Sequence, residues 1–282
     1  MKKIKLAILK IPILGHAIYI PRRMKTALKY FYKPSLNLVK WLFKSNETTN
    51  FTYDLEEDNK RYLALLIAEI LNMQFETVLA YIKEIEEDGD LKHHIKEMTL
   101  NSNFAFMADK EVLFGRRIGW YAFARALKPK IIMETGVDKG IGSCLLTAAL
   151  KRNEEDGHKG KYYGTDINPN AGYLLSGNYA DYGKIIYGDS IESLTEFDEP
   201  IDLFINDSDH SADYEAKEYD IIANKLSKKA IVLGDNSHCT DKLLNFSLKT
   251  NRNFIFFQEK PFNHWYPGAG IGICFNSKSK TT

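Results

Sequence analysis

The sequence is poor in cysteine, with three residues in 282, Cys144, Cys239 and Cys274, lying far apart. They are too few and too scattered for a disulfide framework or a thiolate zinc site, so we expect a reducing, cytoplasmic setting. No uncharged apolar run approaches the roughly 20 residues that a membrane-spanning helix needs, and no small-residue cleavage site marks a signal peptide. The 44% hydrophobic and 27% charged residues are typical of a globular protein, which excludes a disordered, collagen-like or coiled-coil chain.

Acidic residues are absent from the first 44 positions, which hold eleven Lys and Arg. Subtracting these eleven from the 38 basic residues leaves 27 against 37 acidic ones, a net charge of −10 for residues 45–282. We interpret residues 1–45 as a basic amphipathic arm, because its lysines alternate with aliphatic and aromatic residues. Such a segment suits an anionic membrane surface, with the protein peripheral there. Packing of the apolar residues on the body, with the lysines in solvent, is the alternative. Nucleic acid is not an expected partner, since the body is acidic and no binding motif is present.

Two further regions follow the arm. Residues 46–109 predict a helical cap, with helices over 59–73 and 76–88 that bury one face each. Residues 110–282 alternate between strand-like and helix-like segments after a helix over 111–127. The strands are expected at 131–134, 161–165, 185–187, 201–206, 230–234, 254–258 and 270–275. This alternation predicts an α/β fold with a doubly wound, Rossmann-like, seven-stranded sheet whose last strand is antiparallel.

The turn after the first strand reads Glu134-Thr-Gly136-Val-Asp-Lys-Gly140. Glycines at a strand-to-helix turn let the backbone approach a ligand closely. The spacing differs from the Gly-x-Gly-x-x-Gly of dinucleotide enzymes, which cradles a pyrophosphate. An acid at the strand end repels phosphate and suits a cationic ligand, such as a sulfonium that also carries an α-amino group.

Two more acids end the next strands. Asp166 closes the second strand, where a carboxylate can accept both ribose hydroxyls. Asp189, followed by Ser190, closes the third, where it can accept from an adenine amino group, although it could also be a helix N-cap. We therefore expect these residues to bind the cofactor together with the glycine turn.

This pattern resembles the class I S-adenosylmethionine-dependent methyltransferases from about residue 111 onward. Asp207 after the fourth strand and Asp235-Asn236 after the fifth are similar to the metal ligands of catechol and caffeoyl-CoA O-methyltransferases. The resemblance implies a Mg²⁺ or Mn²⁺ ion held by these three residues. Where those enzymes have a lysine as base, this sequence has His210, as in metal-dependent sugar O-methyltransferases of natural-product pathways.

The chemistry of these residues agrees with that role. Three oxygen ligands leave coordination positions for water and substrate oxygens, and a bound metal lowers the pKa of a hydroxyl. His210 could then take the proton near neutral pH, with Asp207 as a second catalytic residue. Asp209 could replace Asp207 as ligand or add to it, and His238 is a reserve base or outer-sphere residue.

The sequence thus predicts a divalent-metal-dependent O-methyltransferase acting on a hydroxylated small molecule, with a sugar or a lipid-linked glycan as candidate acceptors. Two alternatives stay open: a metal-independent N- or O-methyltransferase that uses Asp207 and His210, and a non-catalytic module bound to a membrane. The sequence leaves open whether the chain forms a homo-oligomer. The aromatic segment 262–270 is expected either to line the acceptor side of the site or to pack on the helical cap.

Overall fold

The computed structural model describes residues 12–48, 52–209 and 211–276, with no side-chain detail for residues 12–15. The chain divides into two compact units, one formed by the part up to Ser45 together with Asn263–Pro267, the other by Asn46–Phe262 and Gly268 onward. The first contains helix α2 (Pro12–Lys44). No helix in the described ranges is both long and apolar enough to cross a membrane.

The second unit contains a mixed sheet in the order β3-β2-β1-β4-β5-β7-β6, seven strands within the described residues. Strand β7 pairs antiparallel with β5 and β6, while the other pairs are parallel. This confirms the predicted fold class. The strands are β1 (Ile131–Thr135), β2 (Lys161–Asp166), β3 (Gly183–Tyr187), β4 (Ile201–Asn206), β5 (Leu226–Gly234), β6 (Asn253–Phe257) and β7 (Ile271–Phe275).

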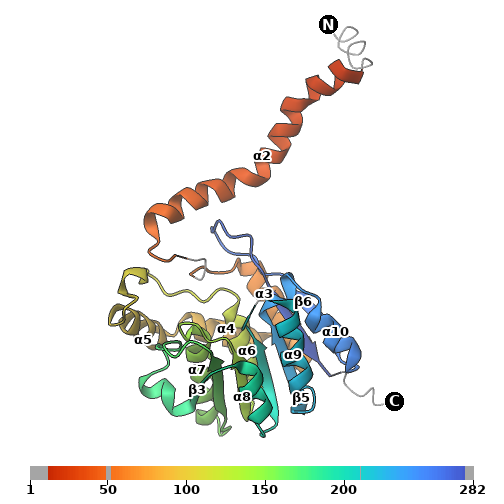
Figure 1. The fold of residues 1–282 in the computed structure, drawn as a ribbon. Helices are drawn as coiled ribbons and strands as arrows, with labels where there is room; N and C mark the ends of the chain where they lie inside the picture. The colour runs from red at the N-terminus through yellow and green to blue at the C-terminus, as the bar shows by residue number, and fades with distance from the viewer. Residues whose placement is uncertain (1–11, 49–51, 210, 277–282) are drawn as a thin grey trace. The chain divides into compact units, whose positions relative to one another are not determined.

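Helices pack in two groups on the sheet (Figure 1). One group is α3 (Glu57–Leu71), α4 (Phe75–Glu86), α5 (Gly89–Leu100), α6 (Arg117–Leu127) and α7 (Ile141–Glu155). The other group is α8 (Ser190–Glu196), α9 (Ala212–Ile222) and α10 (Lys242–Lys249). Short 3₁₀ turns lie at Ala105–Met107 (η1), Gly177–Tyr182 (η2) and Asp235–His238 (η3).

The core explains why the central strands read as continuous apolar runs. All five residues of β1 are buried, because helices cover both faces of the sheet. Met133, Phe204 and Val232 on neighbouring strands pack with Tyr219 and Phe246 from the second helix group. Burial on both faces holds the strands in position. The carboxyl ends of the parallel strands therefore lie together at one edge of the sheet.

Two predicted helix boundaries differ from the structure. The helix expected over 111–127 begins at Arg117, because Gly115 adopts φ +54° and lies against the Tyr53 ring. The helix expected over 76–88 ends at Glu86, and Gly89 begins the next helix, α5, with the Asp88 side chain accepting from the Leu91 N–H at 2.9 Å as its N-cap. The first change comes from a contact with Tyr53 that the local pattern does not reveal, and the second from a local cap.

Gly136 is the glycine on which the site geometry depends. It has φ +79°, and a Cβ there would lie 2.1 Å from the carbonyl oxygen of Asp207. The turn after β1 therefore packs directly on the backbone that leaves β4. No side chain fits between the two turns.

We predict that Gly136→Ala lowers the free energy of unfolding by about 3–5 kcal/mol, since strain at positive φ adds to a backbone clash. Gly157→Ala is the matched control, because Gly157 has φ +86° and nothing within 4 Å of a Cβ. It should lose only about 1–2 kcal/mol, the left-handed penalty alone. Urea denaturation compares the two, and equal losses would refute close packing as the reason for glycine.

Candidate functional site

The carboxyl ends of the parallel strands meet at one edge, where β1 and β4 lie side by side although β2 and β3 intervene in sequence. Ligands of open α/β sheets bind at such a switch in strand order. Three predicted site residues, Glu134, Asp207 and Asp235, come from β1 and from the turns after β4 and β5. The topology thus brings residues a hundred positions apart to one edge.

Glu134 is buried within this edge, with 1% of its surface exposed. Its Oε2 accepts from the Tyr162 hydroxyl at 2.5 Å, and Gly142 leaves room for the carboxyl, since a Cβ there would lie 2.3 Å from Oε1. Burial raises the pKa of Glu134 to about 7, against the opposing effects of the Tyr162 hydrogen bond and the Arg117 charge. Near neutral pH, a cation placed beside this carboxyl would favour its ionised form.

Asp166 organises the turn after β1. Its Oδ2 accepts from the N–H groups of Val137 at 3.1 Å and Asp138 at 3.0 Å, and its Oδ1 from Asn168 N–H at 2.8 Å. Gly140, with φ +96°, begins α7 and packs against Gly172 of the loop after β2. The two turns are therefore held together by backbone contacts. Cofactor binding by Asp166, Gly136 and Gly140 stays a prediction.

Asp189 is the N-cap of α8, as the sequence allowed. Its Oδ1 accepts from Ile191 N–H at 2.7 Å and from the Tyr214 hydroxyl at 2.8 Å. Ser190 is buried, and its hydroxyl lies 2.8 Å from that of Tyr214 and donates to Glu218. An adenine contact from Asp189 or Ser190 remains untested.

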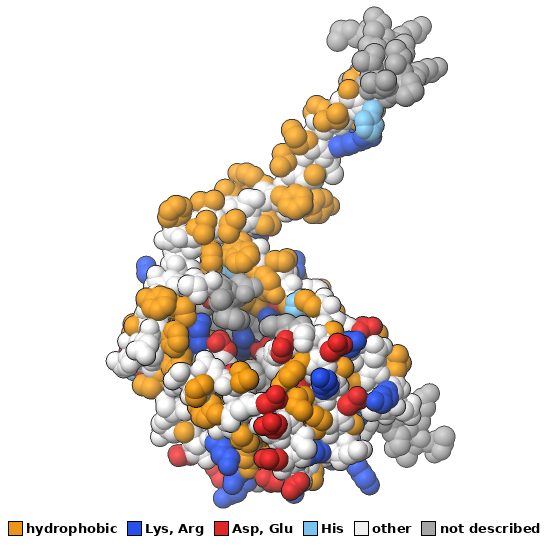
Figure 2. All heavy atoms as spheres, viewed as in Figure 1, with side chains coloured by type: hydrophobic (Ala, Val, Ile, Leu, Met, Phe, Trp, Pro, Cys, Tyr) orange, Lys and Arg blue, Asp and Glu red, His pale blue; other side chains and the backbone are white. Residues whose placement is uncertain are grey.

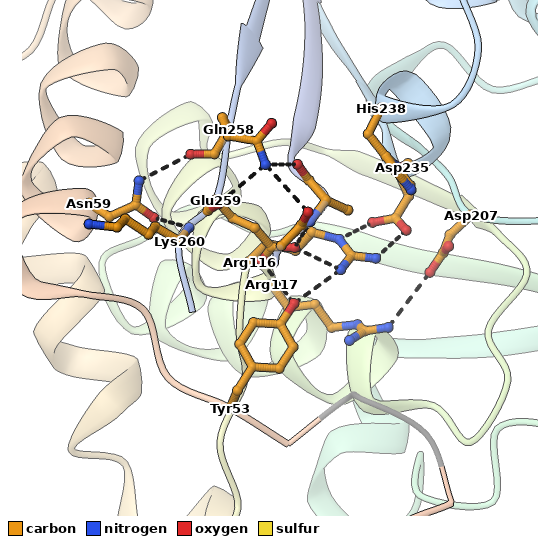
Figure 3. A network of polar contacts seen from close by, with 12 residues as sticks. Tyr53, Asn59, Arg116, Arg117, Asp207, Asp235, His238, Gln258, Glu259 and Lys260 are labelled. Atoms are coloured by element: carbon orange, nitrogen blue, oxygen red, sulfur yellow. Dashed lines mark hydrogen bonds and ion pairs between the residues drawn. The ribbon is translucent and has the colours of Figure 1, made fainter. Parts of the chain in front are cut away.

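Two arginines that sequence reasoning missed face the predicted metal ligands (Figure 3). Arg116 binds Asp235 in bidentate fashion, with Nε donating to Oδ1 at 2.5 Å and Nη2 to Oδ2. Arg117 Nη2 lies 3.8 Å from Asp207 Oδ2. The two residues lie at the start of α6, and consecutive arginines before an apolar helix are the one signal in the sequence that could have indicated them.

Arg116 is also held from the far side. Its Nη1 donates to the Tyr53 hydroxyl at 3.2 Å and to Glu259 Oε1 at 3.3 Å. Tyr53 donates in turn to Glu259 Oε2 at 2.8 Å, and Ala269 N–H to Oε1 at 2.6 Å. This network, which we call the Arg116 network, joins the segment before α3, the start of α6, the end of β5 and the β6–β7 connection.

The two aspartates respond oppositely to this environment. Burial, together with the neighbouring Asp235 charge, raises the pKa of Asp207 well above its usual range. Burial would also raise the pKa of Asp235, but the Arg116 guanidinium overcomes this effect and holds it below its usual value. Of the two carboxyls, Asp207 therefore holds a proton more readily.

Glu218 on α9 is a second residue that the sequence did not reveal. It is fully buried and accepts from Thr135 at 3.1 Å, from Ser208 at 2.8 Å, and from Asn206 and Ser190. Its helix reads as polar at this position, so nothing distinguished it from an exposed acid. Glu218 fixes the ends of β1 and β4 from the opposite face of the sheet.

In the structure, the two carboxylates predicted as metal ligands face arginines. Both oxygens of Asp235 accept from Arg116, and Arg117 faces Asp207, so positive charge already lies beside the two carboxylates. No group of three His, Cys, Asp or Glu in the described part of the chain could hold an ion. Asn236, with 1% of its surface exposed, is buried next to Asp235. The assignment of Asp207, Asp235 and Asn236 as metal ligands stays a prediction, beside an arrangement in which arginines already face both carboxylates.

Three predicted residues remain: the base His210, the reserve residue His238, and Asp209, the alternative metal ligand. His210 lies outside the described residues. Asp209 is exposed, and its Oδ1 accepts from Ser211 N–H at 2.7 Å, so it belongs to the loop before α9. His238 is exposed, with Nδ1 3.0 Å from the Asp235 carbonyl oxygen.

Residues 133–237 match a family model described as a methyltransferase domain. This range runs from within β1 to the turn after β5 and contains the turns described above. The match agrees with the resemblance seen in the sequence: residues 133–237 are similar to a methyltransferase domain.

Several solved structures are similar to this chain at low sequence identity. The SAH-bound methyltransferase PaMTH1 of Podospora anserina is 16% identical, with a TM-score of 0.49, over 72% of this chain and 95% of that one. A methyltransferase from Geobacter sulfurreducens is 17% identical, with a TM-score of 0.47, over 68% and 90%. The O-methyltransferase TomG of Streptomyces achromogenes, in complex with SAM, is 14% identical, with a TM-score of 0.47, over 68% and 91%. No curated protein matches the sequence significantly.

We predict that Arg116→Met lowers the free energy of unfolding by about 3–5 kcal/mol, because it leaves Asp235 buried without its partner. Lys249→Met is the control, since it breaks the exposed ion pair with Asp220 (2.7 Å) and should change stability by no more than about 1 kcal/mol. Thermal and urea unfolding measure both. A similar small loss in both variants would show that the Arg116 network does not stabilise the fold.

Proposed function

We propose that the chain transfers a methyl group from S-adenosylmethionine to a hydroxyl oxygen of a small-molecule or glycan acceptor. The observation that carries this proposal is a small cavity at the switch in strand order, with a volume of about 20 Å³. Residues of both charges line it: Glu134, Asp138 and Asp207 are acidic, and Arg117 and Lys139 are basic. Ligands with separated positive and negative charges suit such a lining.

The α-amino-acid end of S-adenosylmethionine is a ligand of that kind. Its ammonium can donate to Glu134, the one carboxyl buried within β1. Its carboxylate suits Arg117, Lys139 and the N-terminus of α7, whose N-cap Gly140 offers no side chain to the free N–H groups. About 20 Å³ holds roughly one water, so the cavity would take only this end of the cofactor.

The rest of the cofactor would extend over the ends of β2 and β3. There Asp166 is the proposed acceptor for the ribose hydroxyls, and Asp189 and Ser190 for adenine. A carboxylate has about four lone pairs, so Asp166 can bind the turn and a ribose together. Gly136 and Gly140 keep the turn close enough to the sheet for this arrangement.

In the proposed reaction, the acceptor oxygen attacks the methyl carbon in line with its bond to sulfur. That bond breaks, the sulfonium becomes the neutral thioether of S-adenosylhomocysteine, and the hydroxyl proton passes to a carboxylate. Asp207 suits this last role, because burial and the neighbouring Asp235 charge raise its pKa, so its ionised form is a stronger base than an ordinary aspartate. The sequence assignment of His210 as base stays a prediction beside it.

We propose that this chemistry does not need a divalent cation. Arg116 and Arg117 supply positive charge beside Asp235 and Asp207, where the resemblance would place the ion. Positioning and fixed charges then provide the catalysis, as is general for transfer between bound reactants. The metal-dependent reaction predicted from Asp207, Asp235 and Asn236 is the competing hypothesis, and metal binding distinguishes the two.

We expect S-adenosylhomocysteine to bind more weakly at acidic pH, because its ammonium needs ionised Glu134. With a pKa of about 7, the ionised fraction falls from about three-quarters at pH 7.5 to about one-tenth at pH 6, which reduces affinity about eightfold. Glu134→Gln should bind roughly 10–100-fold more weakly at pH 7.5 and lose the pH dependence. Calorimetry measures both, with the exposed Glu192→Gln as control.

The same substitution should stabilise the protein above pH 7. Folding raises the pKa of Glu134 to about 7, so the native state holds the proton more tightly than the unfolded chain does. The free energy of unfolding therefore falls as pH rises from the ordinary pKa of a glutamate to about 7. Glu134→Gln removes this penalty, so its melting temperature at pH 8 should exceed that of the wild type. A chain that binds no S-adenosylhomocysteine at any pH would instead support the non-catalytic alternative.

We predict that Mn²⁺, followed by electron paramagnetic resonance of the free ion, does not bind stoichiometrically to the chain, with or without S-adenosylhomocysteine. The physical reason is that Arg116 occupies both oxygens of Asp235. EDTA should leave the affinity for S-adenosylhomocysteine unchanged. One Mn²⁺ per chain, lost in Asp235→Asn, would establish the metal-dependent reaction instead.

A further inference from the structure

Helix α2 carries a continuous row of exposed apolar side chains. We call Ile20, Met24, Leu28, Phe31, Leu38 and Leu42 the apolar stripe. At 100° per residue their positions fall within an arc of about 80°. Each is at least 40% exposed, and Phe31 reaches 65%. Figure 2 shows apolar side chains along the length of this helix.

Basic residues occupy the opposite side of α2. Six of its seven Lys and Arg fall within an arc of about 100° centred roughly opposite the stripe: Arg22, Lys25, Lys29, Lys33, Lys40 and Lys44. Arg23 lies between the two sides, and the helix contains no acidic residue. Exposed apolar side chains also lie among the basic residues (Ile18, Leu36 and Phe43), and Pro21 and Pro34 stand inside the helix. The stripe is therefore the side of α2 without basic residues, on a helix that is apolar and basic throughout.

The contacts that α2 makes within its own compact unit leave the stripe uncovered. Trp41 packs edge-on against Trp265 at 5.2 Å and His264 at 6.5 Å, and Asn37 Nδ2 donates to the His264 carbonyl at 3.4 Å. Asn37 and Trp41 project from a third side of the helix, between the basic face and the stripe. The aromatic segment Asn263–Pro267 thus packs beside the stripe and not on it.

We propose that α2 binds the surface of an anionic phospholipid bilayer, with the apolar stripe in the boundary between headgroups and acyl chains. Long basic side chains can reach the headgroup phosphates while the stripe enters the bilayer. Charge complementarity favours this occupant. With eleven Lys and Arg and no acid in the first 44 residues, a second copy of the segment would place like charges together, whereas an anionic bilayer surface offers phosphates beside an apolar boundary. The interior of a bilayer is excluded, because a basic residue recurs at nearly every turn.

Co-sedimentation of the full chain with vesicles tests this proposal. Vesicles with 30% phosphatidylserine in phosphatidylcholine should bind the chain at least tenfold more tightly than pure phosphatidylcholine at 0.1 M salt. Raising the salt to 0.5 M should remove most of this preference, since the Debye length shortens to a few ångströms. Equal, salt-independent binding to both vesicles would overturn the electrostatic part of the proposal.

Two variants separate the contributions. Leu28→Ser with Phe31→Ser removes part of the stripe without changing charge, and Lys25→Gln with Lys29→Gln and Lys33→Gln removes charge without changing the stripe. Each should weaken binding to anionic vesicles at least tenfold. The control Lys217→Gln with Lys228→Gln and Lys229→Gln removes three exposed charges from the other unit and should bind as the wild type does.

Analytical ultracentrifugation without lipid distinguishes a second copy of the chain as the occupant. We expect no oligomer that depends on the stripe. Two observations together would overturn the proposal. The wild-type chain would form a dimer that Leu28→Ser with Phe31→Ser abolishes, and it would not bind anionic vesicles. The variants should keep the wild-type cooperative melting of the sheet unit, which shows that lost binding does not come from unfolding.

Discussion

The bidentate ion pair between Arg116 and Asp235 is the interaction on which the site depends. Breaking one partner of such a buried pair leaves an uncompensated charge in a medium of low dielectric constant. Glu259 and Tyr53 complete the shell around the guanidinium, so four separate parts of the chain hold one group. These contacts hold Asp235 in place at the end of β5. Because the Asp235 charge raises the pKa of Asp207, they also affect the protonation of Asp207.

The fold and the strand ends could be predicted because they follow from local patterns. Apolar runs alternating with amphipathic segments identified every strand, and the acids Glu134, Asp166 and Asp207 stand where those runs stop. The partners of these acids could not be predicted. Arg116 and Asp235 are 119 positions apart, and periodicity carries no information on which buried charge meets which. The start of α6 was misplaced for the same reason, since Gly115 turns to fit Tyr53.

Charge is the quantity that organises both compact units, although in opposite ways. At the sheet edge, acidic and basic groups alternate within a few ångströms, which suits a compact zwitterion. Along α2 a single sign extends over the length of the helix, which suits an extended anionic surface. A chain with a net charge of +1 thus contains two regions with contrary electrostatic preferences.

The Arg116 network limits how far the protein can be truncated. The stretch with recognisable family similarity is residues 133–237, yet the guanidinium that compensates Asp235 comes from before it and Glu259 from after it. A fragment trimmed to the similar stretch would keep the aspartate and lose its counter-charge, together with β6 and β7. A fragment that keeps the whole Arg116 network must extend from before Tyr53 to beyond Ala269.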